Sequence, residues 1–339
     1  MVRRQIIQKR ITSFDKKNGS ENVSEKPAFT FIDLFAGIGG IRIGFEDVGC
    51  RCILTSEWDK HAQKTYESNF GEIPNGDITK INPQEIPAFD ILLAGFPCQP
   101  FSQAGLKRGF EDTRGTLFFD IARIVQYHKP RVVFLENVKN LAGHDNGRTL
   151  SVIIKTLENL GYNVFNKVLN AKDFGLPQNR ARVYIIGFRD KIKFEFPREP
   201  KTPTRVGDVL EKNVDGLYTL SDKLWAGHQR RRKEHALKGN GFGYSIFNEN
   251  SSYTSTISAR YYKDGSEILI EQKNKNPRKL TPREAARLQG FPDSFIIPVS
   301  DTQAYKQLGN SVAIPVIKAL ATQIIKELQK VGEGGHNEN

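Results

Sequence analysis

Residues 29–49, with the sequence FTFIDLFAGIGGIRIGFEDVG, decide the fold. The apolar run FTFIDLF is typical of a buried strand, and GGIRIGFEDVG has the apolar spacing of a helix that ends at Gly49. Between them, a glycine-rich turn allows the backbone to approach a ligand closely. A strand, a glycine turn and a helix in this order predict the first unit of a parallel α/β sheet.

The same alternation of apolar runs and amphipathic stretches continues to residue 188. Further strands are predicted at CRCILTSE (50–57), FDILLAG (89–95), RVVFLEN (131–137), YNVFNKVLN (162–170) and RVYIIGF (182–188). This pattern predicts an α/β fold with a doubly wound, mostly parallel, Rossmann-like sheet. Ligands bind such sheets at the carboxyl ends of the strands. Phe35, Glu57, Cys98 and Glu136 fall at or just beyond predicted strand ends, so we expect them to meet at one edge.

The composition is that of a soluble globular protein with a basic balance. The 339 residues include 50 Lys and Arg against 38 Asp and Glu, a net charge of +12 that favours a polyanionic partner. Three cysteines are too few for a disulfide framework, which favours a reducing cytosol. We interpret Cys50 and Cys52 as small strand residues and predict no metal site, because no second cysteine pair follows. No run approaches the roughly 18 apolar residues of a membrane span.

The glycine turn DLFAGIGGIRIG (33–44) lacks the full dinucleotide-binding signature, which would require glycine where Arg42 stands. Glu57 follows Gly37 by 20 residues, the usual place for an acid that hydrogen-bonds ribose hydroxyls. Trp58 is suited to stack on a purine, and Asp77 to accept from an adenine amino group. An adenosine ligand without pyrophosphate favours S-adenosylmethionine over NAD. The alternative is that the glycines serve only a tight turn.

A second group of residues is chemically reactive. Cys98 lies between two prolines in LLAGFPCQPFS (92–102), which suits a thiolate nucleophile; the alternative for a lone cysteine is packing. Glu136 ends a buried strand, which predicts a raised pKa; a helix cap or an arginine partner is the alternative. Arg180 and Arg182 start a strand two residues apart and so point to one face, where they orient a planar heterocycle or form a surface ion pair.

Together these side chains favour one reaction. C5 of cytosine is a poor nucleophile, but addition of a thiolate at C6, with an acid at N3, makes C5 an enamine-like carbon. That carbon can accept a methyl group from a sulfonium donor. Loss of the C5 proton and of the thiol then restores the aromatic ring.

At these residues the sequence resembles the DNA (cytosine-5) methyltransferases, which are class I adenosylmethionine-dependent enzymes. The motifs DLFAGIGG, EWD, GDI, GFPCQPFS, ENV, QNRARVY and QAYKQLGNSVAIPV occur in the order of that family. The resemblance implies that Cys98 is the nucleophile, Glu136 the partner of N3 and Arg182 a contact to the target cytosine, with Arg180 nearby. It implies a pocket for the cofactor S-adenosylmethionine that comprises Phe35, Gly37, Gly39, Gly40, Glu57, Trp58, Asp77, Ile78, Pro97, Leu117 and Asn310.

The resemblance also predicts the domain organisation. Residues 1–28 would be a basic arm, and residues 29–190 together with 304–330 a discontinuous catalytic and cofactor-binding domain, because the last family block folds back beside the first strand. Residues 191–303, which are charged and poor in apolar runs, would form a hinge and a smaller, irregular target-recognition domain. Residues 331–339 would be a tail. We expect a monomer in the bacterial cytoplasm, associated with the nucleoid through DNA.

The expected substrate is double-stranded DNA. Because a ring atom inside a duplex is out of reach, the target base must be flipped out. The predicted DNA contacts are Gln103, Lys107 and Arg108 after the cysteine, Arg230 and Arg231 for phosphates, and Arg260, Tyr261 and Tyr262 for the grooves. Segments of residues 238–270 resemble those of bacterial methylases that act on CC-containing sites such as CCGG or CCWGG.

The leading interpretation is a modification methylase that protects DNA from a cognate restriction endonuclease, without a stable complex between the two. One alternative is a transfer-RNA cytosine-5 methyltransferase of the same fold, which the long basic region after residue 200 disfavours. Another is a non-catalytic DNA-binding regulator, which the presence of Cys98, Glu136 and Arg182 disfavours. A dehydrogenase is disfavoured by Arg42 and by the cysteine loop.

Overall fold

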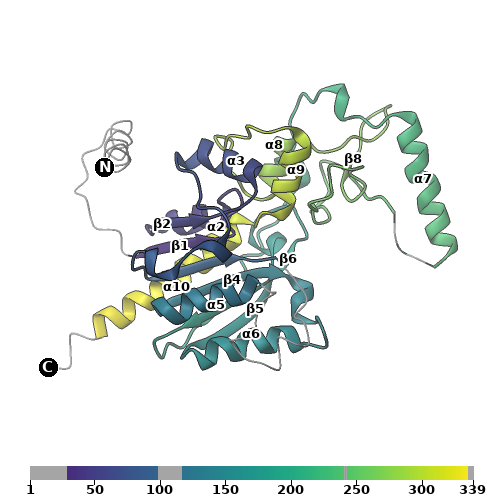
Figure 1. The fold of residues 1–339 in the computed structure, drawn as a ribbon. Coiled ribbons are helices and arrows are strands. Elements are labelled where there is room, and N and C mark those ends of the chain that lie inside the picture. Colours follow the sequence, from purple (N-terminus) through teal and green to yellow (C-terminus); the bar gives the residue numbers. More distant parts are fainter. Residues whose placement is uncertain (1–28, 98–116, 240, 242, 335–339) are drawn as a thin grey trace.

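The computed structural model describes residues 29–97, 117–239, 241 and 243–334. Its centre is a six-stranded sheet in the order β2-β1-β3-β4-β6-β5 (Figure 1). The strands are β1 (Thr30–Leu34), β2 (Arg51–Ser56), β3 (Ile91–Gly95), β4 (Val132–Val138), β5 (Asn163–Asn170) and β6 (Ala181–Phe188). Neighbours from β2 to β4 pair in parallel, and β6 runs antiparallel to β4 and β5. The prediction of a mostly parallel α/β sheet is confirmed.

The central strands are buried on both faces. In β3, Ile91 and Leu93 belong to the core cluster on one face, and Leu92 and Ala94 to the cluster on the other. This double burial explains why the strand reads as a continuous apolar run and not as an alternating one.

Two helical layers cover the sheet. On one face lie α2 (Gly40–Glu46) and α10 (Ile314–Gly334), and on the other α5 (Leu117–His128) and α6 (Arg148–Asn159) (Figure 1). A Cβ atom at Gly44 of α2 would lie 2.6 Å from Cγ2 of Ile317 in α10, so the glycine permits this close packing. The end of the sequence thus packs against the first strand–helix unit.

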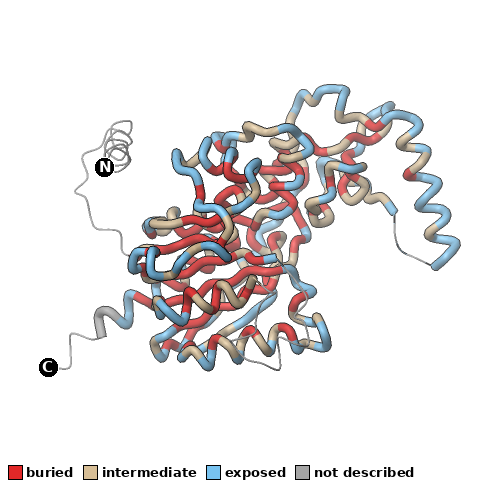
Figure 2. The backbone as a smooth tube through the Cα atoms, in the orientation of Figure 1, coloured by how far each residue is buried: buried red, intermediate tan, exposed pale blue. Residues whose placement is uncertain are grey.

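A smaller, irregular part of the chain lies beside the carboxyl edge of the sheet (Figure 1). It holds α7 (Asp222–Leu237), α8 (Pro282–Leu288), α9 (Asp301–Asn310) and a parallel pair of short strands, β7 (Ile246–Phe247) and β8 (Leu269–Ile270). Its core cluster also includes Ile38 and Ala62, the latter from α3 (Lys60–Phe70). α7 projects away from the other helices, and most of its residues are exposed (Figure 2).

The predicted domain boundaries remain predictions. Ile192 and Phe194, just beyond the boundary predicted at residue 190, pack in the same core cluster as Phe188 of β6. The arm at 1–28 and most of the tail lie outside the described residues.

Within the described ranges, one helical stretch, Asp301–Val331, is long and apolar enough to cross a membrane by length and composition. It comprises α9 and most of α10, and 61% of its most apolar window is buried inside the fold. The core helix of a soluble protein meets the same criteria, so this stretch is weak support for a membrane span.

Candidate active site

The glycine turn after β1 brings backbone to the carboxyl edge of the sheet. Phe35, Gly37 and Gly39 have φ angles of 59°, 55° and 85°, a region that glycine enters freely and phenylalanine rarely. Gly37 and Gly40 line a cavity at this edge. Gly39 does not line it: a Cβ atom there would lie 2.3 Å from the ring of Phe70, so this glycine lets the turn pack against α3.

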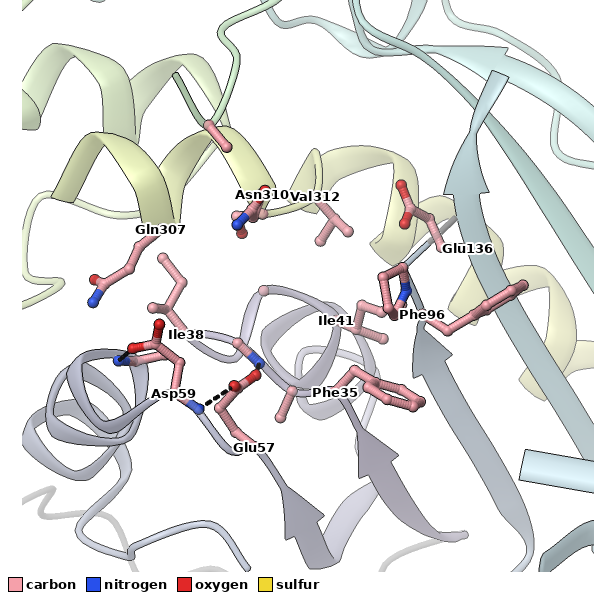
Figure 3. Close-up of a pocket in the computed structure, with 18 of the residues that line it drawn as sticks. Phe35, Ile38, Ile41, Glu57, Asp59, Phe96, Glu136, Gln307, Asn310 and Val312 are labelled. Atoms are coloured by element: carbon pink, nitrogen blue, oxygen red, sulfur yellow. Dashed lines mark hydrogen bonds between the residues drawn. The ribbon is translucent and has the colours of Figure 1, made fainter. Parts of the chain in front are cut away.

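Glu57, directly after β2, is held by two backbone donors. Its Oε2 accepts from the N–H of Gly37 and its Oε1 from the N–H of Asp59, both at 2.8 Å (Figure 3). Burial raises the pKa of this carboxyl, and the N–H donors of Asp59 and Gly37 oppose the shift. Each carboxylate oxygen keeps a second lone pair, with which it can accept a ribose hydroxyl.

Trp58 and Asp77 are two further residues of the cavity lining. The Trp58 side chain is 76% exposed, so its face is open to a purine. Asp77 caps a short 3₁₀ turn through the N–H of Thr79 and also lines the cavity.

Glu136 and Arg182 meet because β4 and β6 are antiparallel, which brings the end of one strand beside the start of the other. The Nε atom of Arg182 lies 3.3 Å from Oε1 of Glu136, and both side chains are largely buried. Burial raises the pKa of Glu136, and the positive charge of Arg182 partly offsets it. The carboxyl therefore keeps its proton to a higher pH than a free glutamate does.

Asn137 holds the strand end that leads to the cysteine. Its Nδ2 donates to the carbonyl oxygen of Phe96 at 2.8 Å. Pro97 lines the cavity, and Cys98 is the next residue along the chain. Cys98 itself lies outside the described residues. The ENV motif marks Asn137 in the sequence, but its contact with Phe96 follows only from the pairing of β3 with β4.

Arg180 is hydrogen-bonded to backbone from two distant segments. Its guanidinium is buried and donates to the carbonyl oxygens of Ile257 at 3.1 Å, Gly309 at 3.0 Å and Ser311. Burial, together with the charge of Arg182, lowers its pKa. Arg180 also borders the cavity beside Arg182, and its Nε has no hydrogen-bond partner among the described residues. Arg180 thus fixes the two segments that carry these carbonyls to each other, and its predicted contact with the heterocycle stays a prediction.

One cavity of about 1070 Å³ joins these groups. Glu57 and Glu136 lie at opposite sides of it (Figure 3). Of the predicted residues, it is lined by Phe35, Gly37, Gly40, Glu57, Trp58, Asp77, Ile78, Pro97, Leu117, Glu136, Arg180, Arg182 and Asn310.

A comparison with protein-family models supplies the deciding observation. The model of the C-5 cytosine-specific DNA methylases matches residues 29–326, which includes every motif described above. The chain belongs to this family. It is a DNA (cytosine-5-)-methyltransferase, and membership implies S-adenosylmethionine as the methyl donor. A dehydrogenase and a non-catalytic regulator are thereby excluded.

Curated relatives agree with this assignment. The type II methyltransferase M.SsoII of Shigella sonnei is 64% identical over 311 residues, which cover 90% of this chain and 82% of that protein. M.NlaX of Neisseria lactamica is 61% identical over 90% of this chain and 99% of its own length. M.HpaII of Haemophilus parainfluenzae is 47% identical over 93% and 94%, respectively.

Solved structures share the fold at low sequence identity. The Dnmt2 methyltransferase of S. pombe superimposes with a TM-score of 0.73 at 21% identity, covering 89% of this chain and 99% of that one. The Entamoeba histolytica methyltransferase EhMeth gives 0.72 at 22%, covering 88% and 98%. These similarities confirm the class I methyltransferase fold.

The residues predicted to contact DNA differ in their exposure to solvent. Gln103, Lys107 and Arg108 lie outside the described residues. Arg230, Arg231 and Arg260 are exposed, and Tyr262 is half-buried.

The prediction that Tyr261 contacts a DNA groove is wrong. This residue is fully buried, its hydroxyl donates to the carbonyl of Ile268 at 2.7 Å, and it accepts from the N–H of Leu280 at 2.8 Å. In a strand, successive side chains point to opposite faces, but a loop has no such regular alternation. The sequence therefore could not tell which of the two adjacent tyrosines points inward.

Several cavity residues escaped the sequence analysis. Thr256 and Ser258 reach it from the smaller part of the chain, and Asp59, Lys306 and Gln307 also line it. Lys306 and Gln307 lie within the QAYKQLGNSVAIPV motif, which was the signal available for them.

Proposed function

We propose that this methyltransferase acts on a cytosine flipped out of a short double-stranded DNA site, through a covalent bond between Cys98 and C6. One observation carries the proposal: a single cavity is lined both by Glu136, Arg182 and Pro97 and by Glu57 and Trp58. A base that enters beside Glu136 would lie in the same cavity as the methyl donor.

Each residue has a chemical task in this proposal. The Cys98 thiolate forms a bond to C6, and the Glu136 carboxyl supplies a proton or hydrogen bond to N3, so that electron density reaches C5. Arg182 orients the ring and keeps Glu136 in place. After methyl transfer, a base removes the C5 proton, and the electrons of that C–H bond expel the thiolate from C6.

The cavity fits S-adenosylmethionine. Glu57 offers carboxylate oxygens to ribose hydroxyls, Trp58 an open aromatic face, and Asp77 an acceptor for the adenine amino group. Phe35, Ile78 and Leu117 add apolar walls, and Asn310 is exposed toward the cavity. When bound, the sulfonium supplies an electrophilic methyl group.

The proposed substrate is DNA and not transfer RNA. The family model and the curated relatives named above are those of DNA methylases or of type II methyltransferases. By analogy with their names, we propose that the chain modifies DNA within a restriction-modification system. We propose further that it acts as a monomer in the bacterial cytoplasm, without a stable complex with the endonuclease. Arg230, Arg231, Arg260 and Tyr262, with Gln103, Lys107 and Arg108, are the proposed DNA contacts.

The test uses tritiated S-adenosylmethionine with defined DNA duplexes and with transfer RNA. We expect label on DNA alone; label on RNA alone, or none, would overturn the proposal. Cys98→Ser should reduce transfer roughly a thousandfold or more while donor binding stays near that of the wild type. Substantial residual transfer would contradict the covalent route. Bisulfite sequencing of DNA from a host that expresses the chain then identifies the recognition site, for which a CC-containing sequence is our proposal.

A further inference from the structure

Two segments far apart in the sequence form opposite walls of the donor side of the cavity. The first carries Glu57 and Trp58 and continues into α3, and the second is α9, which ends at Asn310. No strand pairing joins them among the described residues, since α3 and α9 lie outside the sheet. Their separation must be set by side chains.

Besides the apolar packing of Ala62 in the core cluster that includes Tyr305 and Leu308, three polar contacts connect α3 to the C-terminal segment. Lys306 Nζ lies 2.9 Å from Asp59 Oδ2, at the cavity. Below it, the Thr65 hydroxyl donates to Oε1 of Gln307 at 2.9 Å, in a buried position. At the far end of α3, the side chain of Asn69 exchanges two hydrogen bonds with the backbone of Ile296, at 2.9 and 2.8 Å. We call these three contacts, which reach α9 and the segment just before it, the α3–α9 clasp.

The ion pair is the contact of the clasp in which both partners line the cavity, and Asp59 has two separable tasks in it. Its Oδ1 caps α3 by accepting from the N–H groups of His61 and Ala62, while Oδ2 faces Lys306. Although burial alone would raise the pKa of Asp59, the bond from Lys306 and these N–H donors lower it. Asparagine caps helices as well as aspartate does, so Asp59→Asn removes the charge on this pair and keeps the cap.

We propose that Asp59 and Lys306 are positioning residues for the methyl donor: their ion pair holds the wall of Glu57 and Trp58 at the distance from Asn310 that the donor needs. This inference rests on the proposed donor site. Figure 3 shows Asp59 and Gln307 together on the side of the cavity away from Glu136. The pair therefore acts on donor binding and leaves the groups proposed to act on the base unchanged.

The size of the effect follows from the exposure of the pair. The two side chains are 46% and 28% exposed, and ion pairs of this kind contribute little to folding. We expect the melting temperature to stay nearly unchanged. Donor affinity should fall about two- to fivefold when either charge is removed, mainly through faster dissociation, and the wild-type advantage should shrink at high salt.

The experiment is a double-mutant cycle of Asp59→Asn and Lys306→Met, with donor affinity measured by calorimetry on the full chain. We expect each single variant to bind more weakly and the double variant to bind no more weakly than the worse single one. KM for the donor should rise while kcat at saturating donor stays within about twofold.

Lys318 provides a matched control. Its ammonium lies 3.0 Å from Asp47, with exposures of 53% and 43%, and this pair also joins a C-terminal helix to an N-terminal one, but away from the cavity. Lys318→Met should leave donor affinity unchanged. If Lys318→Met weakens binding as much as Lys306→Met does, the effect is general and the proposal is wrong.

The double-mutant cycle also distinguishes a positioning role of the ion pair from direct binding of the donor by Lys306. If Lys306 bound the donor itself, Asp59→Asn would free the ammonium and tighten binding, which is opposite to our expectation and would overturn the proposal. Unchanged affinity in both single variants would overturn it too. Failure of the wild type to bind S-adenosylmethionine would instead contradict the proposed function.

Discussion

The Nε atom of Arg182 lies 3.3 Å from Oε1 of Glu136, at the point where β4 ends and β6 begins. Burial favours the protonated carboxyl and the guanidinium favours the carboxylate. The arginine thus moderates how tightly Glu136 holds the proton that the proposed reaction requires.

Glu136→Gln should lower the single-turnover methylation rate by about 10²- to 10⁴-fold, because glutamine has no proton to transfer to N3. The folded-state pKa of Glu136 is raised, so the active, protonated form persists below that pKa and is lost as pH rises through it. The wild-type rate should therefore fall on the alkaline side, and the residual rate of the variant should not. Arg182→Gln should shift this alkaline fall in rate to higher pH, because it removes the positive charge that favours the carboxylate. If the rate of Arg182→Gln falls at the same pH as that of the wild type, this account is contradicted.

Gly309→Ala should destabilise the protein and reduce activity. A Cβ atom at Gly309 would lie 2.3 Å from the carbonyl carbon and oxygen of Ser258, and backbone cannot move aside as a side chain can. We expect a loss of about 1–3 kcal/mol in the free energy of unfolding, measured by denaturant titration. The control is Gly227→Ala in α7, where the added Cβ meets nothing within 4 Å. That change should stabilise the protein by about 0.5–1 kcal/mol.

Replacing the outward charges of α7 should weaken DNA binding without loss of catalysis. The helix carries five Lys and Arg against two Asp and Glu, a difference of +3. Arg231 is paired with Asp264 at 3.3 Å, and Arg232 lies over the ring of Tyr244. Arg230 has only a longer contact, 3.7 Å, with Glu234, and both of these side chains are exposed, so Arg230 and Lys233 are more available. Arg230→Gln with Lys233→Gln should reduce the slope of log affinity against log salt by roughly 2.

The matched control for this pair is Lys326→Gln, an exposed lysine on α10. We expect it to leave the salt slope unchanged, and kcat at saturating DNA to be the same in all three proteins. Equal slopes for the wild type and the α7 variant would show that this helix does not contact phosphates.

Asp33→Asn should change how stability depends on pH. Asp33 is fully buried in β1, and neither of its carboxylate oxygens has a hydrogen-bond partner among the described residues. Burial raises its pKa from 3.8 to about 8. Between these values the folded chain holds a proton that the unfolded chain has released, so the free energy of unfolding falls as pH rises.

The asparagine variant lacks this titration. Its melting temperature should exceed that of the wild type more at about pH 8 than at about pH 5. A constant difference between the two proteins across that range would mean that Asp33 is ionised in the folded state.

Much of the fold was predictable because its signals are local. Alternating apolar runs and helical spacing define the strands and helices without knowledge of their partners, and the glycine turn with Glu57 follows from backbone conformation and strand length. Gly39 illustrates the limit: a glycine in the right motif packs against Phe70, because the ring approaches from a helix whose orientation the motif does not contain.

The sequence by itself determined the chemistry: a cysteine beside proline, an acid at a strand end and an arginine at a strand start, with an adenosine site, point to one reaction. Only the tertiary structure decided which of these groups meet. It pairs Arg182 with Glu136, commits Arg180 to the carbonyls of Ile257, Gly309 and Ser311, buries Tyr261, and joins Asp59 to Lys306. The reason is physical: a side chain's type is encoded at its own position, but its partners are set by the backbones that folding brings beside it.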